Sequence, residues 1–362
     1  MEKYLTPRQL SKYRERVERV LEDEAFVIGA RERKLINERT ANGRRYFYLV
    51  AKRHEGNKMI ERFIKVPQND SQKLLLPFKR QVEFAKFLKK HQVIKTRGVV
   101  DANCDLKRGT PFAIMETFPA AKAKIGFIEG DKGADRLGAR EARRVLNQLL
   151  KLHAVSIGSL PPALKKILKA HKGGYKDFKK EVGRLLDKKV KPLGLKRGKE
   201  SFYRVLERHF GVHDLKGSVN GLLERARPFI DAKANRGPAL AHGDMAPNNL
   251  YVFDSGEVEL LDLEWVGLFN NKALAMIDDF GNLRARAWSN RKFREALDNE
   301  LIKIYRRRKQ EELGKMIVRL SILHAHLLLA GFFENYPWPK QKDRAQTRRR
   351  ILTERDIAKA LA

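Results

Sequence analysis

The sequence has little cysteine and no long apolar run. Its one cysteine, Cys104, cannot form a disulfide within the chain or assemble a metal cluster by itself, so we expect a reducing, cytoplasmic compartment. The most apolar run, 320–333, contains Ser321 and two histidines. It is shorter than the roughly 20 residues that a transmembrane helix needs, so the run predicts a buried helix and we expect no membrane span. The first residues also lack the apolar core of a signal peptide.

Acidic residues are in short supply. The 362 residues include 77 Lys and Arg against 44 Asp and Glu, which gives a formal net charge of +33. Residues 161–200 alone hold 14 Lys and Arg against 4 Asp and Glu. This excess attracts phosphate-bearing partners, unless it only reflects a compositional preference of the source proteome. The chain shows no RNA-recognition signature, zinc-finger spacing or helix-turn-helix pattern, so nucleic acid is a possible partner but not the favoured one.

The chain is long enough for two domains, and its pattern changes near residue 117. Before that point the pattern predicts a mixed domain, 1–117. Thr6-Pro7-Arg8-Gln9 has the form of a capping box at the start of a helix. The predicted elements are helices at 7–24 and 74–91 and strands at 25–30, 34–38, 45–51, 59–66, 98–101 and 111–116.

The second predicted domain, 118–362, is mainly helical. Amphipathic patterns predict helices at 140–155, 163–170, 175–186, 199–210, 216–233, 273–288, 291–308, 311–334 and 344–362. The segment 240–265 interrupts this run and predicts two short strands. We therefore expect an α+β fold with a small sheet domain and a larger helical one.

That interruption carries the chemistry. Apolar strands at 250–253 and 258–261 are joined by Asp-Ser-Gly-Glu, a hairpin turn signal. A hairpin brings its ends together, so Asn249 and Asp262 are expected side by side, with Asp244 on the preceding loop. A carboxylate and an amide suit Mg²⁺, which completes its shell with water and phosphate oxygens. Another carboxylate nearby can accept a proton from an attacking hydroxyl, as phosphoryl transfer requires.

The pattern His242-Gly-Asp-x-x-x-x-Asn249, a hairpin and then Asp262 resembles the aminoglycoside phosphotransferase and choline kinase-like superfamily. The resemblance runs from about residue 26 to 282. It implies a two-lobed protein-kinase-like fold, with an antiparallel-sheet N-lobe at 1–117 and a helical C-lobe at 118–362. It also implies that Asp244 is the catalytic base and that Asn249 and Asp262 hold Mg²⁺. Asp279 matches an aspartate that is structural in relatives, with its neighbour Asp278 as the other candidate.

The resemblance extends into the first domain. It implies that Lys65, on a strand, grips the α and β phosphates of ATP and that Glu83, on the next helix, positions Lys65. The backbone of Glu116 and Phe118, at the hinge that follows the last strand, would meet adenine.

Other readings of these residues stay open. Lys65 could be one more solvated lysine in a basic chain, and Glu83 could pair on the helix surface with Lys79 or Lys86. His153, at the end of a helix, is interpreted as a packed, hydrogen-bonded core residue, as is His242. No Gly-x-Gly-x-x-Gly precedes Lys65, so 27–30 or the Asn-Gly turn at 42–43 would have to serve as the phosphate loop.

The sequence thus predicts an ATP- and Mg²⁺-dependent phosphotransferase that acts on a hydroxyl of a small molecule. The net charge favours an anionic or neutral acceptor over a cationic one. Two alternatives remain: a nucleotide-binding pseudokinase, and a basic protein of the same fold associated with nucleic acid.

Overall fold

A computed structural model describes most of the chain: residues 5–42, 44–117, 126–127, 135–170, 173–192, 199–210, 213–331, 335–336 and 355–361. These residues form two compact units. Unit 1 contains the described parts of Met1–Ala123, Pro161–Leu168 and Glu259–Trp265. Unit 2 contains those of Lys124–Leu160, Lys169–Val258 and Val266–Ala362.

Unit 1 is built on one five-stranded sheet. Its strands are β1 (Phe26–Val27), β2 (Tyr46–Glu55), β3 (Lys58–Pro67), β4 (Val99–Asn103) and β5 (Phe112–Glu116). They lie in the order β1-β2-β3-β5-β4, and every neighbouring pair is antiparallel. A tight turn with Gly56 at φ 61° joins β2 to β3, a backbone angle that glycine adopts without strain.

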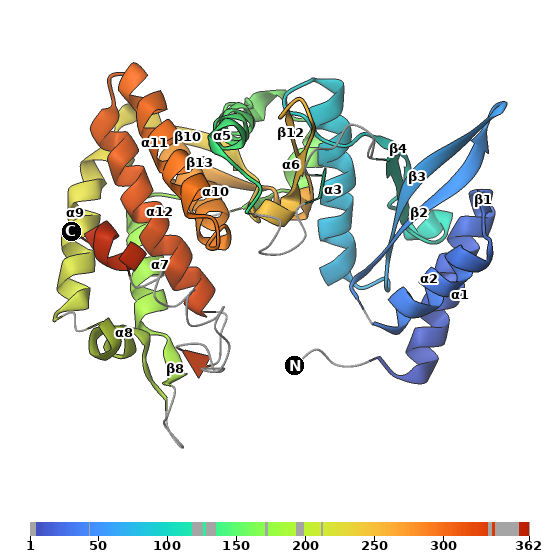
Figure 1. The fold of residues 1–362 in the computed structure, drawn as a ribbon, viewed down its shortest axis with the longest axis horizontal. Helices are drawn as coiled ribbons and strands as arrows, with labels where there is room; N and C mark the ends of the chain where they lie inside the picture. The colour runs from blue at the N-terminus through green and yellow to red at the C-terminus, as the bar shows by residue number, and fades with distance from the viewer. Residues whose placement is uncertain are drawn as a thin grey trace. The chain divides into compact units, whose positions relative to one another are not determined.

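Helices cover this sheet (Figure 1). They are α1 (Pro7–Asp23), α2 (Ala30–Ala41) and α3 (Gln72–Lys90). Helix α6 (Pro162–Ile167) and the 3₁₀ turn η6 (Leu263–Trp265) pack against α3, and the 3₁₀ turn η1 (Leu106–Arg108) lies between β4 and β5. The predicted capping box at α1 is confirmed, because Thr6 and Gln9 exchange side-chain-to-backbone hydrogen bonds.

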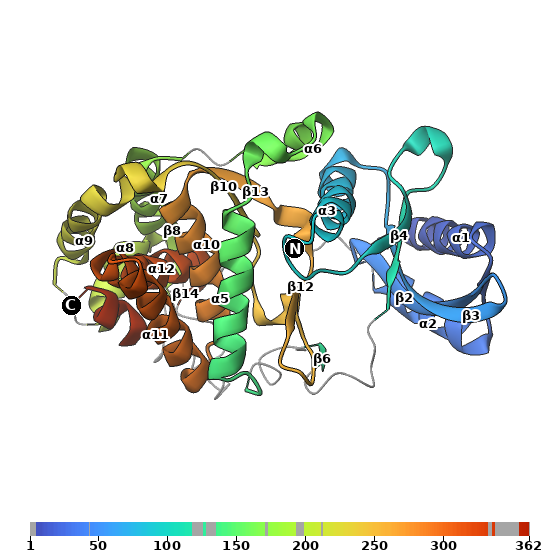
Figure 2. The ribbon, with the colours of Figure 1, turned by 90° about the horizontal axis from the view of Figure 1, so that it is seen from above.

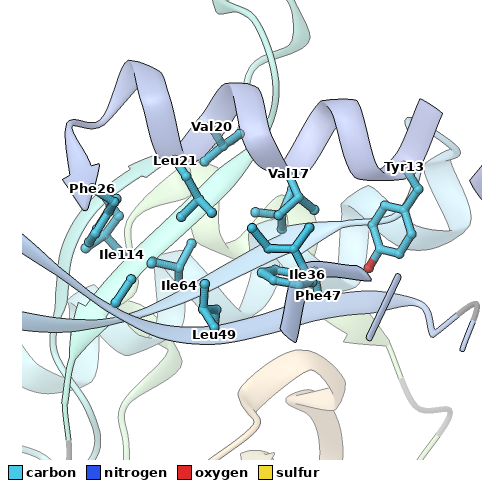
Figure 3. Packing of buried hydrophobic residues seen from close by; sticks show 12 residues of the cluster. Tyr13, Val17, Val20, Leu21, Phe26, Ile36, Phe47, Leu49, Ile64 and Ile114 are labelled. Carbon is cyan, nitrogen blue, oxygen red and sulfur yellow. The ribbon is translucent and has the colours of Figure 1, made fainter. Parts of the chain in front are cut away.

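Alternation along the strands gives the sheet two different faces. Phe47 and Ile64 join a core that includes Val17 of α1, and Figure 3 shows this layer under the helix. Their neighbours point the other way, where Tyr46 packs against Phe78 of α3. Because side chains alternate along a strand, Lys65, between Ile64 and Val66 on β3, projects to the α3 face.

The strands predicted at 34–38 and 25–30 are largely wrong. Only Phe26–Val27 is a strand, and α2 occupies 30–41. Glu32 accepts a hydrogen bond from the backbone N–H of Gly29 and so caps this helix. Ile36 and Thr40, four residues apart, are the buried residues of α2. This spacing places both on one helical face. The predicted strand at 34–38 covers only one of these two residues, so the helical period could not be seen in it.

Unit 2 is mainly helical. Its helices are α5 (Ala139–His153), α7 (Tyr175–Asp187), α8 (Phe202–Phe210), α9 (Leu215–Ile230), α10 (Lys272–Arg286), α11 (Arg291–Arg307) and α12 (Glu311–Gly331), with the 3₁₀ turns η3 (Ile157–Ser159), η4 (Lys233–Asn235) and η5 (Pro247–Asn249). Helix α10 packs against α5 and α12, and α11 lies beside both of these (Figure 2). The predicted buried helix at 320–333 is confirmed over 320–328, where the side chains of α12 are almost all buried.

Short strands connect these helices: β6 (Gly126–Phe127), β7 (Lys169–Ala170), β8 (Lys189–Pro192), β9 (Glu200–Ser201), β10 (Arg236–Ala241), β11 (Leu250–Val252), β12 (Val258–Leu260), β13 (Gly267–Asn271) and β14 (Asn335–Tyr336). The predicted hairpin is present: β11 and β12 are neighbours in their sheet, and the Phe253 N–H donates to the Glu257 carbonyl across the turn at 2.9 Å. The α+β class predicted from the sequence is therefore confirmed. Among the described residues, no helix is long and apolar enough to span a bilayer.

The close approach of α10 to α12 gives a test of this packing. A Cβ added at Gly281 would come within 2.6 Å of the Ser321 carbonyl oxygen. We expect Gly281→Ala to lower the free energy of unfolding by about 1–3 kcal/mol, because backbone cannot yield as a flexible side chain does. In α7, a Cβ at Gly183 meets nothing within 4 Å, so Gly183→Ala should stabilise by about 0.4–1 kcal/mol. Urea unfolding of both variants measures this, and equal effects would contradict the packing.

Candidate active site

Lys65 is a buried cation in unit 1, with 1% of its side chain exposed. Its ammonium donates to Gln81 Oε1 and Glu264 Oε1 and lies 3.7 Å from Asp262 Oδ1. It also sits over the ring of Tyr46, 4.0 Å from the centroid. Burial alone lowers the pKa of Lys65, but the acidic groups around it outweigh burial and the net shift is upward. Lys65 is therefore a charged, paired lysine and not the solvated one that the sequence left open.

The predicted pairing of Lys65 with Glu83 is not found. The charged and amide partners of the Lys65 ammonium among the described residues are Gln81, Asp262 and Glu264, and Glu83 is not one of them. Gln81 and Glu83 are two residues apart on α3, and at about 100° per residue they point in nearly opposite directions. Glu83 instead lines a surface hollow of about 550 Å³ with Lys79 and Lys86, which agrees with the alternative reading of a helix-surface residue.

Glu264 is the partner that sequence reasoning missed. It lies in η6, two residues after Asp262, and is itself buried. Burial raises the pKa of Glu264, the Lys65 charge lowers it, and the net shift is upward. The Arg80 guanidinium of α3 donates to the Glu264 backbone carbonyl at 2.7 Å. The only sequence signal for this role was the spacing Asp-x-Glu directly after a strand.

Asp262 combines an uncommon backbone conformation with a buried carboxylate oxygen. Its φ of 54° lies in the left-handed region, which non-glycine residues rarely adopt and which is enriched at functional sites. Its Oδ1 atom is buried, yet accepts no hydrogen bond from any described residue. A carboxylate oxygen without a donor is a suitable ligand for Mg²⁺, so Asp262 fits the predicted metal role.

The predicted adenine-binding residues receive less support. The Glu116 N–H already donates to the Gly98 carbonyl at 3.0 Å. The Glu116 carboxylate accepts from the Gly98 N–H at 3.1 Å and from Lys89 at 3.0 Å. Its backbone N–H is thus used within unit 1. Phe118 lies outside the described residues, and its contact with adenine stays a prediction.

The two segments predicted as phosphate loops lie at the two ends of helix α2. Residues 27–30 contain the end of β1, the N-cap Gly29 and the first residue of α2. Asn42 is the C-cap of the same helix, and residue 43 lies outside the described residues. Helix α2 therefore occupies most of the chain between β1 and β2, and the role of either segment as a phosphate loop stays a prediction.

Asp279 of α10 fixes the loop that begins at His242 in unit 2. Its carboxylate is fully buried and accepts from the His242 N–H at 2.8 Å and the Gly243 N–H at 2.9 Å. His153, at the end of α5, contacts the same carboxylate at 2.8 Å. Burial raises the pKa of Asp279, but the hydrogen bond and attraction of His153 outweigh it and the net shift is downward. The structural role predicted for Asp279, and the core role for His153, are confirmed.

This loop brings Asp244 and Asn249 together, as predicted. Asn249, in η5, donates from Nδ2 to the Asp244 backbone carbonyl at 2.7 Å and lies 3.5 Å from its Oδ2. Arg286 of α10 forms an ion pair with Asp244 Oδ1 at 2.8 Å. Arg286 was not predicted, since it follows Asp244 by 42 residues and no local pattern links them. Asp262 belongs to unit 1, so its proximity to Asn249 stays a prediction.

No protein-family model matches this sequence, and no curated protein is significantly similar to it. Similar solved structures exist. The GDP and kanamycin complex of APH(2")-IIia is 14% identical, with a TM-score of 0.47 over 87% of this chain and 93% of that one. A Plasmodium vivax ethanolamine kinase is 13% identical, with a TM-score of 0.42 over 88% of this chain and 84% of that one.

A choline/ethanolamine kinase family protein from Mesorhizobium loti is 15% identical, with a TM-score of 0.42 over 87% of this chain and 88% of that one. Because these TM-scores lie below 0.5, we base the function proposed below on the chain's own residues.

The roles of Glu264 and Glu83 can be distinguished by the free energy of unfolding of their variants. Glu264→Gln should lower the free energy of unfolding by about 3 kcal/mol, the low end for breaking a buried ion pair, since Asp262 remains as a partner. Glu83→Gln should change it by less than about 0.5 kcal/mol. Urea unfolding measures both free energies. A larger loss from Glu83→Gln than from Glu264→Gln would support the predicted pairing of Lys65 with Glu83.

Asp279 gives a pH test. The pKa of its folded form is below the ordinary value of 3.8, so its stabilising effect is present above that value and is lost as the pH falls through the folded pKa. Asp279→Asn should cost about 2–3 kcal/mol at pH 7, and its difference from the wild type should shrink below pH 3.8. The control is Asp231→Asn, at an aspartate whose side chain is 45% exposed and pairs with Arg227 at the surface. A difference in the free energy of unfolding that does not change with pH would contradict the ionised state proposed for the buried Asp279 carboxylate.

Proposed function

We propose that this chain is an ATP- and Mg²⁺-dependent phosphotransferase that transfers the γ-phosphate to a hydroxyl of a small molecule. The observation that carries the proposal is the buried, charged Lys65 among Asp262, Glu264 and Gln81. Lysines are almost never fully buried unless paired, and strongly perturbed buried charges gather at functional sites. A lysine held charged in this way is suited to bind the α and β phosphates of a nucleotide.

The proposed metal ligands are Asp262 and Asn249. When bound, Mg²⁺ would neutralise charge on the phosphates during transfer. Asp262 supports this role through its left-handed backbone and its buried Oδ1 without a donor among the described residues. Asn249 donates from Nδ2 to the Asp244 carbonyl, which leaves its Oδ1 as the atom available for a cation.

Asp244 is the proposed base. The acceptor oxygen forms a bond to the γ-phosphorus as the bond to the ADP oxygen breaks, and Asp244 takes the hydroxyl proton. The loop from His242 supports this role, because its first two N–H groups are fixed to the buried Asp279. A fixed loop holds the carboxylate in place before the acceptor arrives, which lowers the cost of orientation.

Separate variants test the base and the metal ligand. Asp244→Asn should lower ADP release at least about 10³-fold, in line with the loss of a base that also orients the nucleophile. It should keep the thermal stabilisation by Mg²⁺ plus ATP or GTP, which is about 2.7 kcal/mol at 100 times Kd. Asp262→Asn should lose the metal-dependent part of that stabilisation. Scanning calorimetry and a coupled ADP assay measure the two effects.

The control is Asp254→Asn, which changes an exposed aspartate in the β11–β12 turn and should alter neither property. Equal, small effects of the Asp244 and Asp262 variants would refute both assignments. Metal-dependent nucleotide binding without ADP release would favour a pseudokinase. If no nucleotide stabilises the protein, the basic surface and nucleic acid become the better hypothesis.

A further inference from the structure

Arg286 and Asp279 lie on the same side of α10. They are seven residues apart, two helical turns, and such residues share a helical face. Asp279 holds the backbone of His242 and Gly243, and Arg286 holds the carboxylate of Asp244. One face of α10 therefore contacts three successive residues of the loop.

The ion pair with Arg286 engages one of the two carboxylate oxygens of Asp244. Oδ1 accepts from the Arg286 guanidinium at 2.8 Å. For Oδ2, the contact within the described chain is Asn249 Nδ2 at 3.5 Å, the long limit for a hydrogen bond. Oδ2 is thus the oxygen left for an incoming hydroxyl. The Asp244 side chain is 27% exposed and the Arg286 side chain 33%, so neither is closed off from solvent.

We infer that Arg286 makes the acceptor site selective for hydroxyl compounds that carry a carboxylate or phosphate group. The inference rests on the proposed role of Asp244 as the base. A cationic group that approached Asp244 would meet a guanidinium already bound to the carboxylate. Arginine carries five N–H donors in a planar fork that matches carboxylate and phosphate oxygens. The donors not used by Asp244 can bind such a group beside the reacting hydroxyl.

A rival feature on α10 is Asp278, which lies about 100° round the helix from Asp279. It precedes Arg286 by eight residues, which is about 12 Å along the helix. An acidic residue there could attract a cationic acceptor. We expect Arg286 to have the larger effect on acceptor choice because it contacts Asp244 directly.

The test uses small acceptors that differ mainly in charge: glycerate and glycerol 3-phosphate, glycerol, and choline. ADP release is measured for the full-length wild type, Arg286→Gln and Arg286→Glu. The wild type should use glycerate or glycerol 3-phosphate at least 10-fold better in kcat/KM than glycerol or choline. Arg286→Gln should raise KM for the anionic compound at least 10-fold, with a smaller effect on glycerol. Arg286→Glu should shift the preference toward choline.

Arg291→Gln is the matched control. It removes the same charge from a side chain that is 79% exposed and pairs with Glu295, and the preference should not change. Thermal unfolding of each variant shows whether it is folded. The ratio between glycerate and glycerol 3-phosphate tells whether the site takes a carboxylate or a phosphate.

The outcomes separate this inference from the proposed function. A wild type that prefers choline or glycerol, or an Arg286→Gln variant that loses activity equally with every acceptor, overturns the inference and leaves the phosphotransferase standing. If no compound is turned over, the same four are tested as inhibitors of the slow transfer to water. Inhibition by the anions that Arg286→Gln abolishes supports the inference, and its absence overturns it. No nucleotide binding and no ADP release at all refute the proposed function and the inference together.

Discussion

The fully buried carboxylate of Asp279 must take its hydrogen bonds from the protein, because no water reaches it. Its three partners come from α5 and from the loop at His242 and Gly243. Helix α10 carries Asp279, and its glycine at 281 lets it pack directly against the backbone of α12. The position of the loop, and with it that of Asp244, therefore depends on how α10 sits in the helical core.

The same helix carries further buried charge. Arg284 pairs with Asp298 of α11 and with Asp356 near the end of the chain. Asp356 also contacts Arg294 and His326, and the net effect of burial and these cationic partners holds its pKa well below the usual range. The described segment 355–361 is thus tied to three helices of unit 2. Breaking such a pair is costly, so this network fixes the C-terminal end of α10, which carries Arg284 and Arg286.

In unit 1 the buried charge is a cation, and it too must find its partners within the protein. Lys65 is placed on the α3 face by strand alternation, and its ammonium is then surrounded by Asp262, Glu264 and Gln81. Two of these partners come from a segment nearly 200 residues later in the chain. Asp262, one of these partners, has a left-handed backbone, so the surroundings of Lys65 include the one proposed metal ligand that lies in unit 1.

The sequence by itself determined the local features: the α+β class, the capping box at Thr6, the hairpin turn after residue 253, and the grouping of Asp244 with Asn249. Each depends on residues close together in the chain, whose spacing fixes their geometry. The tertiary structure alone decided the partners of buried charges. It paired Lys65 with Glu264 in place of Glu83, and Asp244 with Arg286, because ion pairs between distant segments leave no periodic signal. The helix at 30–41 also depends on tertiary structure. Ile36, on its buried face with Thr40, packs into a core that α1 and the sheet supply.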